Sequence, residues 1–157
     1  MADGGLVFAG GGTRIRVAPA AAEEMRRLAA VAFPQEVAGV LVGRYVGGDL
    51  AEIVSVTGPT TDSTHGLTAC ERGSAGLTEL LERLWDEGLY YLGEWHTHPA
   101  APPTPSDTDT ETMRGFARDP AVRCPEPILL ILGGVAGAEI WSASMFGTVE
   151  RWLERTS

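Results

Sequence analysis

The sequence predicts an α/β fold in which helices flank a mixed central β-sheet, and three observations support this prediction. Strand-like segments interleave with amphipathic helical segments, as in folds whose sheet is covered on both faces. Gly-rich turns between some neighbouring strands indicate hairpins, which add antiparallel pairs. The 157 residues, 44% of them hydrophobic, suffice for one domain with a sizeable core. We therefore expect a single domain over 1–157, with a flexible Gly-rich segment at 1–12.

The first half of the chain reads as strand, helix and hairpin. Thr13–Val17 alternates polar and apolar residues, which is typical of a half-buried strand. A helix follows, with Pro19 in its first turn, and it ends before Pro34. Val37–Arg44 is a continuous apolar run typical of a strand covered on both faces. A Gly-Gly turn then leads to its expected hairpin partner, Leu50–Thr57.

The middle of the chain begins with a loop at Gly58–Gly66, which is rich in Gly, Thr and Ser. A second amphipathic helix is expected over Ser74–Glu87, with Gly88 at its C-terminal cap. Leu89–His98 then reads as a strand, and a Pro-rich loop ends it.

The last third begins with a helix from Ser106 through Phe116, because Ser106 and Asp109 have the spacing of a capping box. Two strands follow, "PILLILGG" and, after a Gly-rich turn, "AEIWSASMF". The segment "TVERWLER" is predicted to form a short terminal helix.

Charge and composition exclude several classes of function. Twelve Lys and Arg stand against 21 Asp and Glu, and the net charge of −9 argues against non-specific binding to nucleic acid or anionic membranes. A partner with a basic docking segment suits this chain better. The N-terminus lacks the basic start of a secretory signal, and the longest apolar stretch is too short to span a bilayer, so we expect a soluble, cytoplasmic protein. Cys70 and Cys124 are isolated and are interpreted as packing residues.

The stretch "GEWHTHPAAPPTPSDTD" holds two of the three histidines. On a strand, His96 and His98 project from the same face, so their imidazoles are placed to bind one cation. A catalytic zinc typically has three ligands from His, Asp or Glu and keeps a fourth position for water. The prolines favour folding of the helix start back onto the strand. The third ligand is then Asp107, Asp109 or Glu111, and spacing alone does not choose among them.

Simpler explanations exist for each of these residues. A His-x-His pair on a strand occurs without a metal, and Ser106 with Asp109 is explained by helix capping alone. Glu94 shares the strand face of the histidines and is either an outer partner of a ligand or an ordinary solvent-facing acid. The tryptophans at apolar positions, Trp95, Trp141 and Trp152, are interpreted as core residues.

Together, however, these residues resemble the signature of the JAMM (JAB, or MPN-plus) metalloprotease family. The signature is H-x-H, then Ser eight residues and Asp eleven residues after the second His, with prolines between. The family also has a glutamate before a Gly-containing hydrophobic strand, and "PQEVAGVLVGR" resembles this with Glu36. Ala38 departs from the family's common Gly-Gly pair. The resemblance covers roughly residues 13 to 150.

The resemblance implies a single JAB/MPN domain with a cytidine deaminase-like fold and one catalytic Zn²⁺. It implies that His96, His98 and Asp109 bind the zinc, that a water completes the shell, and that Glu36 takes the proton of that water. By the same analogy, Ser106 donates a hydrogen bond to the oxyanion that forms on the substrate.

Within bacterial relatives, the stretch is similar to stand-alone proteases encoded with ubiquitin-transfer-like enzymes in antiphage operons, including the CBASS type. This implies an isopeptidase that releases a conjugated protein, such as a cyclic nucleotide synthase, by cleaving an extended C-terminal tail. A peptidase that trims a ubiquitin-like sulfur carrier remains an alternative, as does a metal-free scaffold of the same fold. A zinc nucleoside deaminase would need a Pro-Cys-x-x-Cys pair, and "RCPEP" offers one Cys. DNA-associated relatives share His-x-His-Pro, but this chain has no obvious DNA-binding face.

Overall fold

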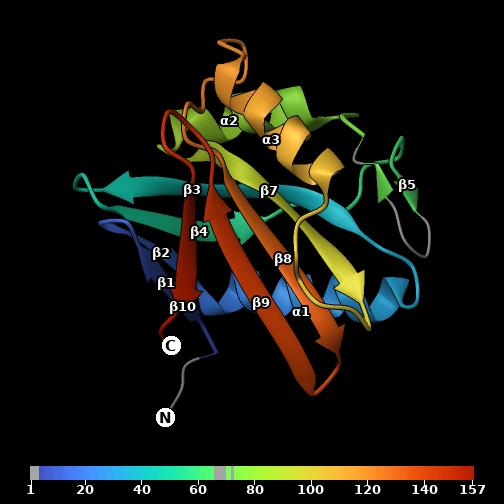
Figure 1. Ribbon diagram of the computed structural model, residues 1–157. Helices are drawn as coiled ribbons and strands as arrows, with labels where there is room; N and C mark the ends of the chain where they lie inside the picture. Colours follow the sequence, from blue (N-terminus) through green and yellow to red (C-terminus); the bar gives the residue numbers. More distant parts are fainter. Residues whose placement is uncertain (1–3, 66–69, 72) are drawn as a thin grey trace.

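The computed structural model describes residues 4–65, 70–71 and 73–157. Its larger sheet consists of β1 (Leu6–Gly10), β2 (Thr13–Val17), β3 (Ala38–Val46), β4 (Leu50–Val56), β7 (Tyr90–Pro99), β8 (Ile128–Val135), β9 (Ala138–Met145) and β10 (Arg151–Arg155). Over the described residues, these strands pair in the order β1-β10-β9-β8-β7-β3-β4-β2, and β2 pairs back onto β1. The sheet therefore closes into a barrel (Figure 1).

The sheet is mixed, as predicted, because β2 with β4 and β7 with β8 pair in parallel while the remaining neighbours are antiparallel. The sheet closes into a barrel, whereas a central sheet flanked by helices was predicted. The strands β1 and β10, which take part in this closure, were not predicted from sequence. Part of the segment 1–12, expected to be flexible, forms β1, with Leu6 and Phe8 buried. The predicted helix in "TVERWLER" is wrong, since Arg151–Arg155 is a strand between β1 and β9.

Three helices in the described part of the chain cover the sheet: α1 (Pro19–Ala32), α2 (Leu77–Asp86) and α3 (Asp107–Arg118). All three were predicted, with ends that differ by a few residues. Gly88, just past α2, has a φ of 76°, the left-handed conformation that favours glycine at a helix end. Figure 1 shows α2 and α3 together on one side of the sheet and α1 on the other.

Over the residues that the structure describes, the hydrophobic core consists of three clusters, and each cluster packs against one of the three helices. The inner face of the barrel packs with α1 in one large cluster that includes Met25, Trp95 and Trp141. On the outer face, α3 contributes Met113 to a cluster with Leu129 and Ile131 of β8. A third cluster joins α2 to the outer face of β3. Since each cluster lies on one side of the sheet, β3 and β8 are covered on both faces, which explains their long apolar runs.

A separate two-stranded sheet lies between β4 and α2 in the chain. The predicted loop at Gly58–Gly66 contains β5 (Thr64–His65), which pairs with β6 (Cys70–Glu71), and its last residue lies outside the described part. Cys124 is buried, and burial raises the pKa of its thiol to about 11, consistent with a packing role. Among the described residues, none of the helices has the length and apolar character required to cross a membrane.

The Pro-rich loop is fixed against the outer face of β8 and β9. Ala100 N donates to Gly134 O at 2.8 Å, and Gly134 N donates to Ala101 O at 2.9 Å. Gly133 permits this approach, because a Cβ there would lie 2.5 Å from Ala101 O. Ser142 Oγ donates to Pro103 O at 2.6 Å. The loop therefore delivers the start of α3 to a defined position beside the end of β7.

Candidate metal centre

Strand β7 presents alternate side chains to opposite faces of the sheet. Trp95 and Thr97 face inward and are 1% and 2% exposed. His96 and His98 face outward, with side chains 12% and 16% exposed. The two imidazoles therefore lie side by side at the end of a central strand, accessible from solvent and supported by a packed core.

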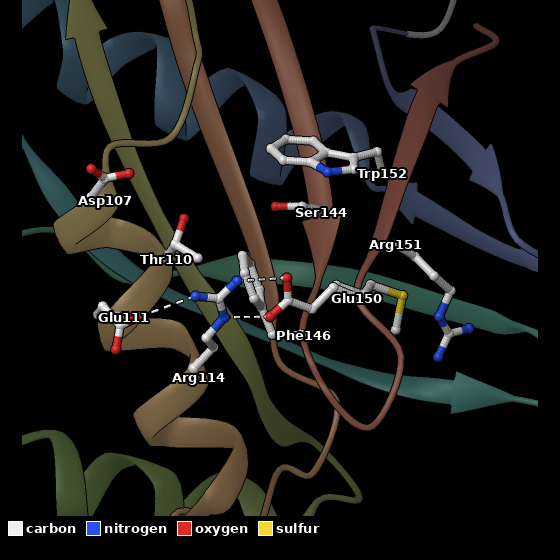
Figure 2. Close-up of a pocket in the computed structure, with 10 residues that line it drawn as sticks. Asp107, Thr110, Glu111, Arg114, Ser144, Phe146, Glu150, Arg151 and Trp152 are labelled. Atoms are coloured by element: carbon white, nitrogen blue, oxygen red, sulfur yellow. Dashed lines mark hydrogen bonds and ion pairs between the residues drawn. The ribbon is translucent and has the colours of Figure 1, made fainter.

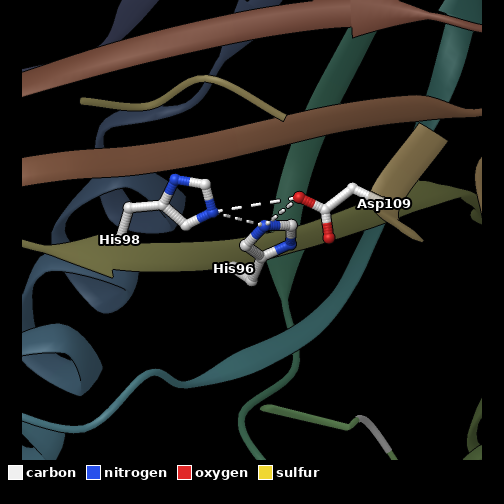
Figure 3. A group of neighbouring side chains, drawn as sticks. All are labelled: His96, His98 and Asp109. Carbon is white, nitrogen blue, oxygen red and sulfur yellow. Dashed lines mark hydrogen bonds and ion pairs between the residues drawn. The ribbon is translucent and has the colours of Figure 1, made fainter. Parts of the chain in front are cut away.

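Asp109 of α3 completes a compact group with these two histidines (Figure 3). His96 Nε2 lies 3.2 Å from His98 Nε2 and 3.2 Å from Asp109 Oδ2. His98 Nε2 lies 3.8 Å from the same carboxylate oxygen. Three potential ligand atoms therefore point toward one another from two different elements.

A second hydrogen bond orients His98 for ligation. Its Nδ1 lies 3.0 Å from the carbonyl oxygen of Pro102. Because a carbonyl only accepts, Nδ1 carries the proton in this bond, and Nε2 of the neutral ring is left with its lone pair directed at His96 and Asp109. Backbone carbonyls commonly fix the tautomer of a metal-binding histidine in this way.

Asp109 is fixed by the capping box of α3, which the sequence predicted. Asp109 N donates to Ser106 Oγ at 3.0 Å, and Ser106 N donates to Asp109 Oδ2 at 2.8 Å. Burial disfavours the ionised carboxylate, but hydrogen bonding and charge from His96, with the bonds from Ser106, outweigh it and lower the pKa of Asp109 to about 2. At neutral pH the carboxylate is therefore available as an anionic ligand.

The other two acids that the spacing left open lie elsewhere on α3. Neither Asp107 nor Glu111 belongs to the described group that is able to hold a metal. Glu111 instead forms an ion pair with Arg114 at 3.0 Å. Residues two positions apart on a helix face different directions, so the side chain of Asp109 alone turns toward the histidines.

Glu36 lies just before β3, the strand that pairs with the histidine-bearing strand β7. The β3·β7 register pairs Ala38 with His96, and two residues further along the antiparallel pair Glu36 comes opposite His98. Glu36 is 8% exposed, and burial raises its pKa, while the charges of His98 and His96 oppose that rise. A buried carboxylate with a raised pKa thus borders the His96, His98 and Asp109 group.

Thr97, which anchors Val37 next to Glu36, was not identified from sequence. Thr97 Oγ1 accepts a hydrogen bond from Val37 N at 3.0 Å, and Thr97 N donates to Val37 O at 3.0 Å. Both bonds anchor the residue next to Glu36 onto β7 between the two histidines. The place of Thr97 between the two histidines of the H-x-H motif is the sequence signal that could have identified it.

We expect Thr97→Val to destabilise the fold by about 1–3 kcal/mol, because it leaves the buried Val37 N–H without its acceptor. Thr97→Ser keeps the oxygen and is expected to cost clearly less. Denaturant unfolding of both variants measures the difference. Equal stability of Thr97→Val and the unaltered protein would contradict the anchoring role.

The donor set fits a zinc ion. Ligand atoms at ~2.0–2.1 Å from a tetrahedral ion lie about 3.4 Å apart, close to the separations of 3.2, 3.2 and 3.8 Å measured here. Two imidazoles and one carboxylate with an accessible side are also typical of a catalytic rather than a structural site. Glu94 is not part of this group; it is buried and accepts a hydrogen bond from the Tyr91 hydroxyl.

Comparison with known proteins places this geometry in a family context. The family model described as prokaryotic homologs of the JAB domain matches residues 18–146. A solved structure, that of protein DSY2949 from Desulfitobacterium hafniense, superposes with a TM-score of 0.61 at 22% identity, covering 86% of this chain and 84% of that one. At this identity, the likeness concerns the fold alone.

Two curated relatives have names that describe an activity. The CD-NTase/cGAS isopeptidase of Enterobacter hormaechei subsp. hoffmannii (strain UCI 50) is 43% identical over 112 residues, which are 70% of this chain and 62% of that protein. The probable metalloprotease y4qB of Sinorhizobium fredii (strain NBRC 101917 / NGR234) is 44% identical over 52 residues, 32% of this chain and 30% of that protein. The matched region thus spans less than two thirds of either relative.

Proposed function

The chain belongs to the family of prokaryotic homologs of the JAB domain, and from this premise we propose that it is a zinc-dependent isopeptidase. The observation that carries the proposal is the convergence of His96, His98 and Asp109, with Glu36 just before the neighbouring strand β3. The names of the isopeptidase and metalloprotease relatives support the same reaction class. We propose that the substrate is a protein with a conjugated, extended C-terminal tail, such as a ubiquitin-like modifier or a nucleotide synthase.

In this mechanism His96, His98 and Asp109 hold the metal, and Glu36 and Ser106 act on the reacting atoms. When bound, zinc would polarise the scissile carbonyl and lower the pKa of a water ligand to about 7. Glu36 accepts the proton of the attacking water and then donates it to the leaving amine. Burial raises the pKa of Glu36, which strengthens it as a proton acceptor.

Ser106 serves two purposes that do not compete. In the capping box its oxygen accepts from Asp109 N, so the hydroxyl proton remains available. We propose that this proton is donated to the oxyanion that develops when water attacks the carbonyl. Helix capping, which alone explains why serine stands here, therefore does not exclude a catalytic role.

Ser106→Ala is expected to lower kcat by about 10²–10³-fold, the range found for loss of one oxyanion donor. It also removes a helix cap worth about 1 kcal/mol, whereas glycine at the same position costs only a few tenths. Ser106→Gly is therefore the matched control. Unfolding and turnover are measured for both variants. If activity falls with stability in Ser106→Ala but is retained in Ser106→Gly, the hydroxyl acts only as a cap.

The proposed reaction is tested with one modifier joined to a target lysine by an isopeptide bond and, separately, to a target N-terminus by a peptide bond. Products are identified by mass spectrometry with and without a zinc chelator. We expect release of the intact modifier from the lysine conjugate and loss of release with the chelator. Cleavage of neither substrate by metal-loaded protein would contradict the proposal.

A further inference from the structure

A cavity lies on the far side of α3 from the metal centre. Its volume is about 390 Å³, and its walls come from the first turns of α3, from β9 and from the start of β10. Figure 2 shows Asp107 and Thr110 of α3 on one side and Trp152 of β10 on the other, with Ser144 between them. The Arg114–Glu150 ion pair closes the cavity below (Figure 2).

Trp152 is the unexpected member of this cavity. It was predicted to be a core residue, but it is 63% exposed, unlike Trp95 and Trp141. The described cation–π contacts involve Arg26 with Trp141 and Arg123 with Trp85, so no described cation covers the ring of Trp152. An exposed indole face at the wall of a polar cavity is a ready platform for a cation.

The charges that line the cavity leave an excess of negative charge. Arg114 is bound by Glu150 through two hydrogen bonds and by Glu111 through a third. Arg151 is paired with Glu126 at 2.7 Å. Asp107 forms no ion pair with any residue that the structure describes. Both guanidinium groups are thus neutralised within the protein, and one carboxylate remains for a ligand.

Helix α3 connects this cavity directly to the metal centre. Asp107 and Thr110 line the cavity, while Asp109 between them faces the histidines. A helix with its side chains is about 10–12 Å across. The path around half of the helix circumference is about 16–19 Å. Extended chain covers about 3.3–3.6 Å per residue, so roughly three residues span the straight distance and up to about six follow the surface from one site to the other.

We propose that this cavity is a subsite for a lysine or arginine side chain of the protein substrate, about three to six residues from the cleaved bond. The indole of Trp152 stacks on the alkyl stem and the cationic group, and Asp107 pairs with that group. The hydroxyl of Thr110 is placed to accept a further hydrogen bond from it. The proposal rests on the proposed isopeptidase function for the identity of its ligand, and it deepens that function by defining substrate preference.

The overall composition favours the same ligand. A chain with a net charge of −9 attracts basic segments over distances of about a Debye length. Close to the surface, the cation–π contact and the carboxylate then select the basic side chain. An anionic side chain would meet Asp107 and the acids that already hold both arginines, so it is disfavoured.

Cross-linking tests binding without any need for turnover. All twelve basic residues of this chain are arginine, so carbodiimide coupling joins its carboxylates to side-chain amines of the partner and not to its own. The probe is a blocked Gly-Ser peptide with one lysine, applied to the full chain and mapped by mass spectrometry. We expect coupling at Asp107 well above coupling at Asp86, an exposed acid on α2. Equal coupling at Asp86 and Asp107 would overturn the proposal.

Kinetics test the preference in the substrate. Fusion tails carry either lysine or glutamine at successive positions within six residues of the cleaved bond. Trp152→Ala and Asp107→Asn are each expected to lower kcat/KM for the preferred lysine tail by about tenfold, with less than a twofold effect on the glutamine tail. Trp152→Phe is expected to recover most of the loss, because it keeps an aromatic face. A loss that is equal for both tails would indicate a structural effect and would overturn the subsite.

The two proposals fail in different ways. If tails are cleaved but Trp152→Ala and Asp107→Asn change neither coupling nor tail preference, the subsite is wrong while the isopeptidase function stands. If the peptide couples selectively at Asp107 but no conjugate or tail is cleaved, the cavity binds a basic side chain and the proposed function is wrong.

Discussion

His98→Ala is expected to remove bound zinc and to abolish cleavage of the conjugate. The variant leaves two ligands, His96 Nε2 and Asp109 Oδ2, which lie 3.2 Å apart and under-coordinate the ion. Changes to outer partners alone typically weaken metal binding 10–100-fold, so loss of a direct ligand is expected to exceed that range. Elemental analysis and a zinc titration followed by a chromophoric chelator measure the effect.

The fold is expected to survive this substitution. His98 lies at the outer face of β7, and its removal takes away one hydrogen bond to Pro102 without opening the core around Trp95. Circular dichroism therefore accompanies the metal analysis. Asp107→Asn and Glu111→Gln are the matched controls, since each removes a nearby carboxylate that lies outside the group; both are expected to keep the zinc. Full zinc in His98→Ala, or its loss in Asp107→Asn, would refute the ligand set.

The sequence predicted the elements that carry their own local signal. The Ser106–Asp109 capping box and the alternation of β7 depend on residues close together in the chain, and both features are present. The closure of the barrel has no such signal, because β1 is a five-residue strand in a Gly-rich segment. The segment that contains its partner β10 has Val149, Trp152 and Leu153 at helical spacing, and pairing with β1 and β9 outweighs that local preference.

The site, too, has features that follow from local sequence and features that depend on contacts between distant residues. That His96 and His98 share a face follows from strand geometry alone. Which acid joins them depends on the direction of α3, and this is set by hydrogen bonds between the Pro-rich loop and Gly134, distant in sequence. The position of Glu36 depends on the β3·β7 register, and the roles of Thr97 and of the Pro102 carbonyl depend on tertiary contacts. None of these follows from residue spacing.

Glu36→Gln is expected to leave zinc in place and to reduce turnover by 10²–10⁴-fold or more. General acid–base catalysis contributes about that range, and here one carboxylate would act first as acceptor and then as donor. Glutamine keeps the size and hydrogen-bonding capacity of the side chain but has no proton to exchange. Since Glu36 is 8% exposed and borders the metal group rather than a separate binding surface, affinity for the tail is expected to change little. Single-turnover cleavage and zinc content are measured on one preparation.

A matched control for Glu36→Gln exchanges the residues at positions 35 and 36. In the double variant Gln35→Glu, Glu36→Gln, composition and net charge stay the same, but the carboxylate moves to an exposed position next to the buried one. This variant is expected to be as slow as Glu36→Gln. Where the chain enters a strand, adjacent side chains are directed to different sides, so a carboxylate at position 35 does not reach the metal group. Restored cleavage would mean that local negative charge, not a positioned base, is what the reaction needs. Near-normal turnover in Glu36→Gln with full zinc would refute the proton-transfer role, and loss of zinc with activity would make Glu36 a ligand or a support for one.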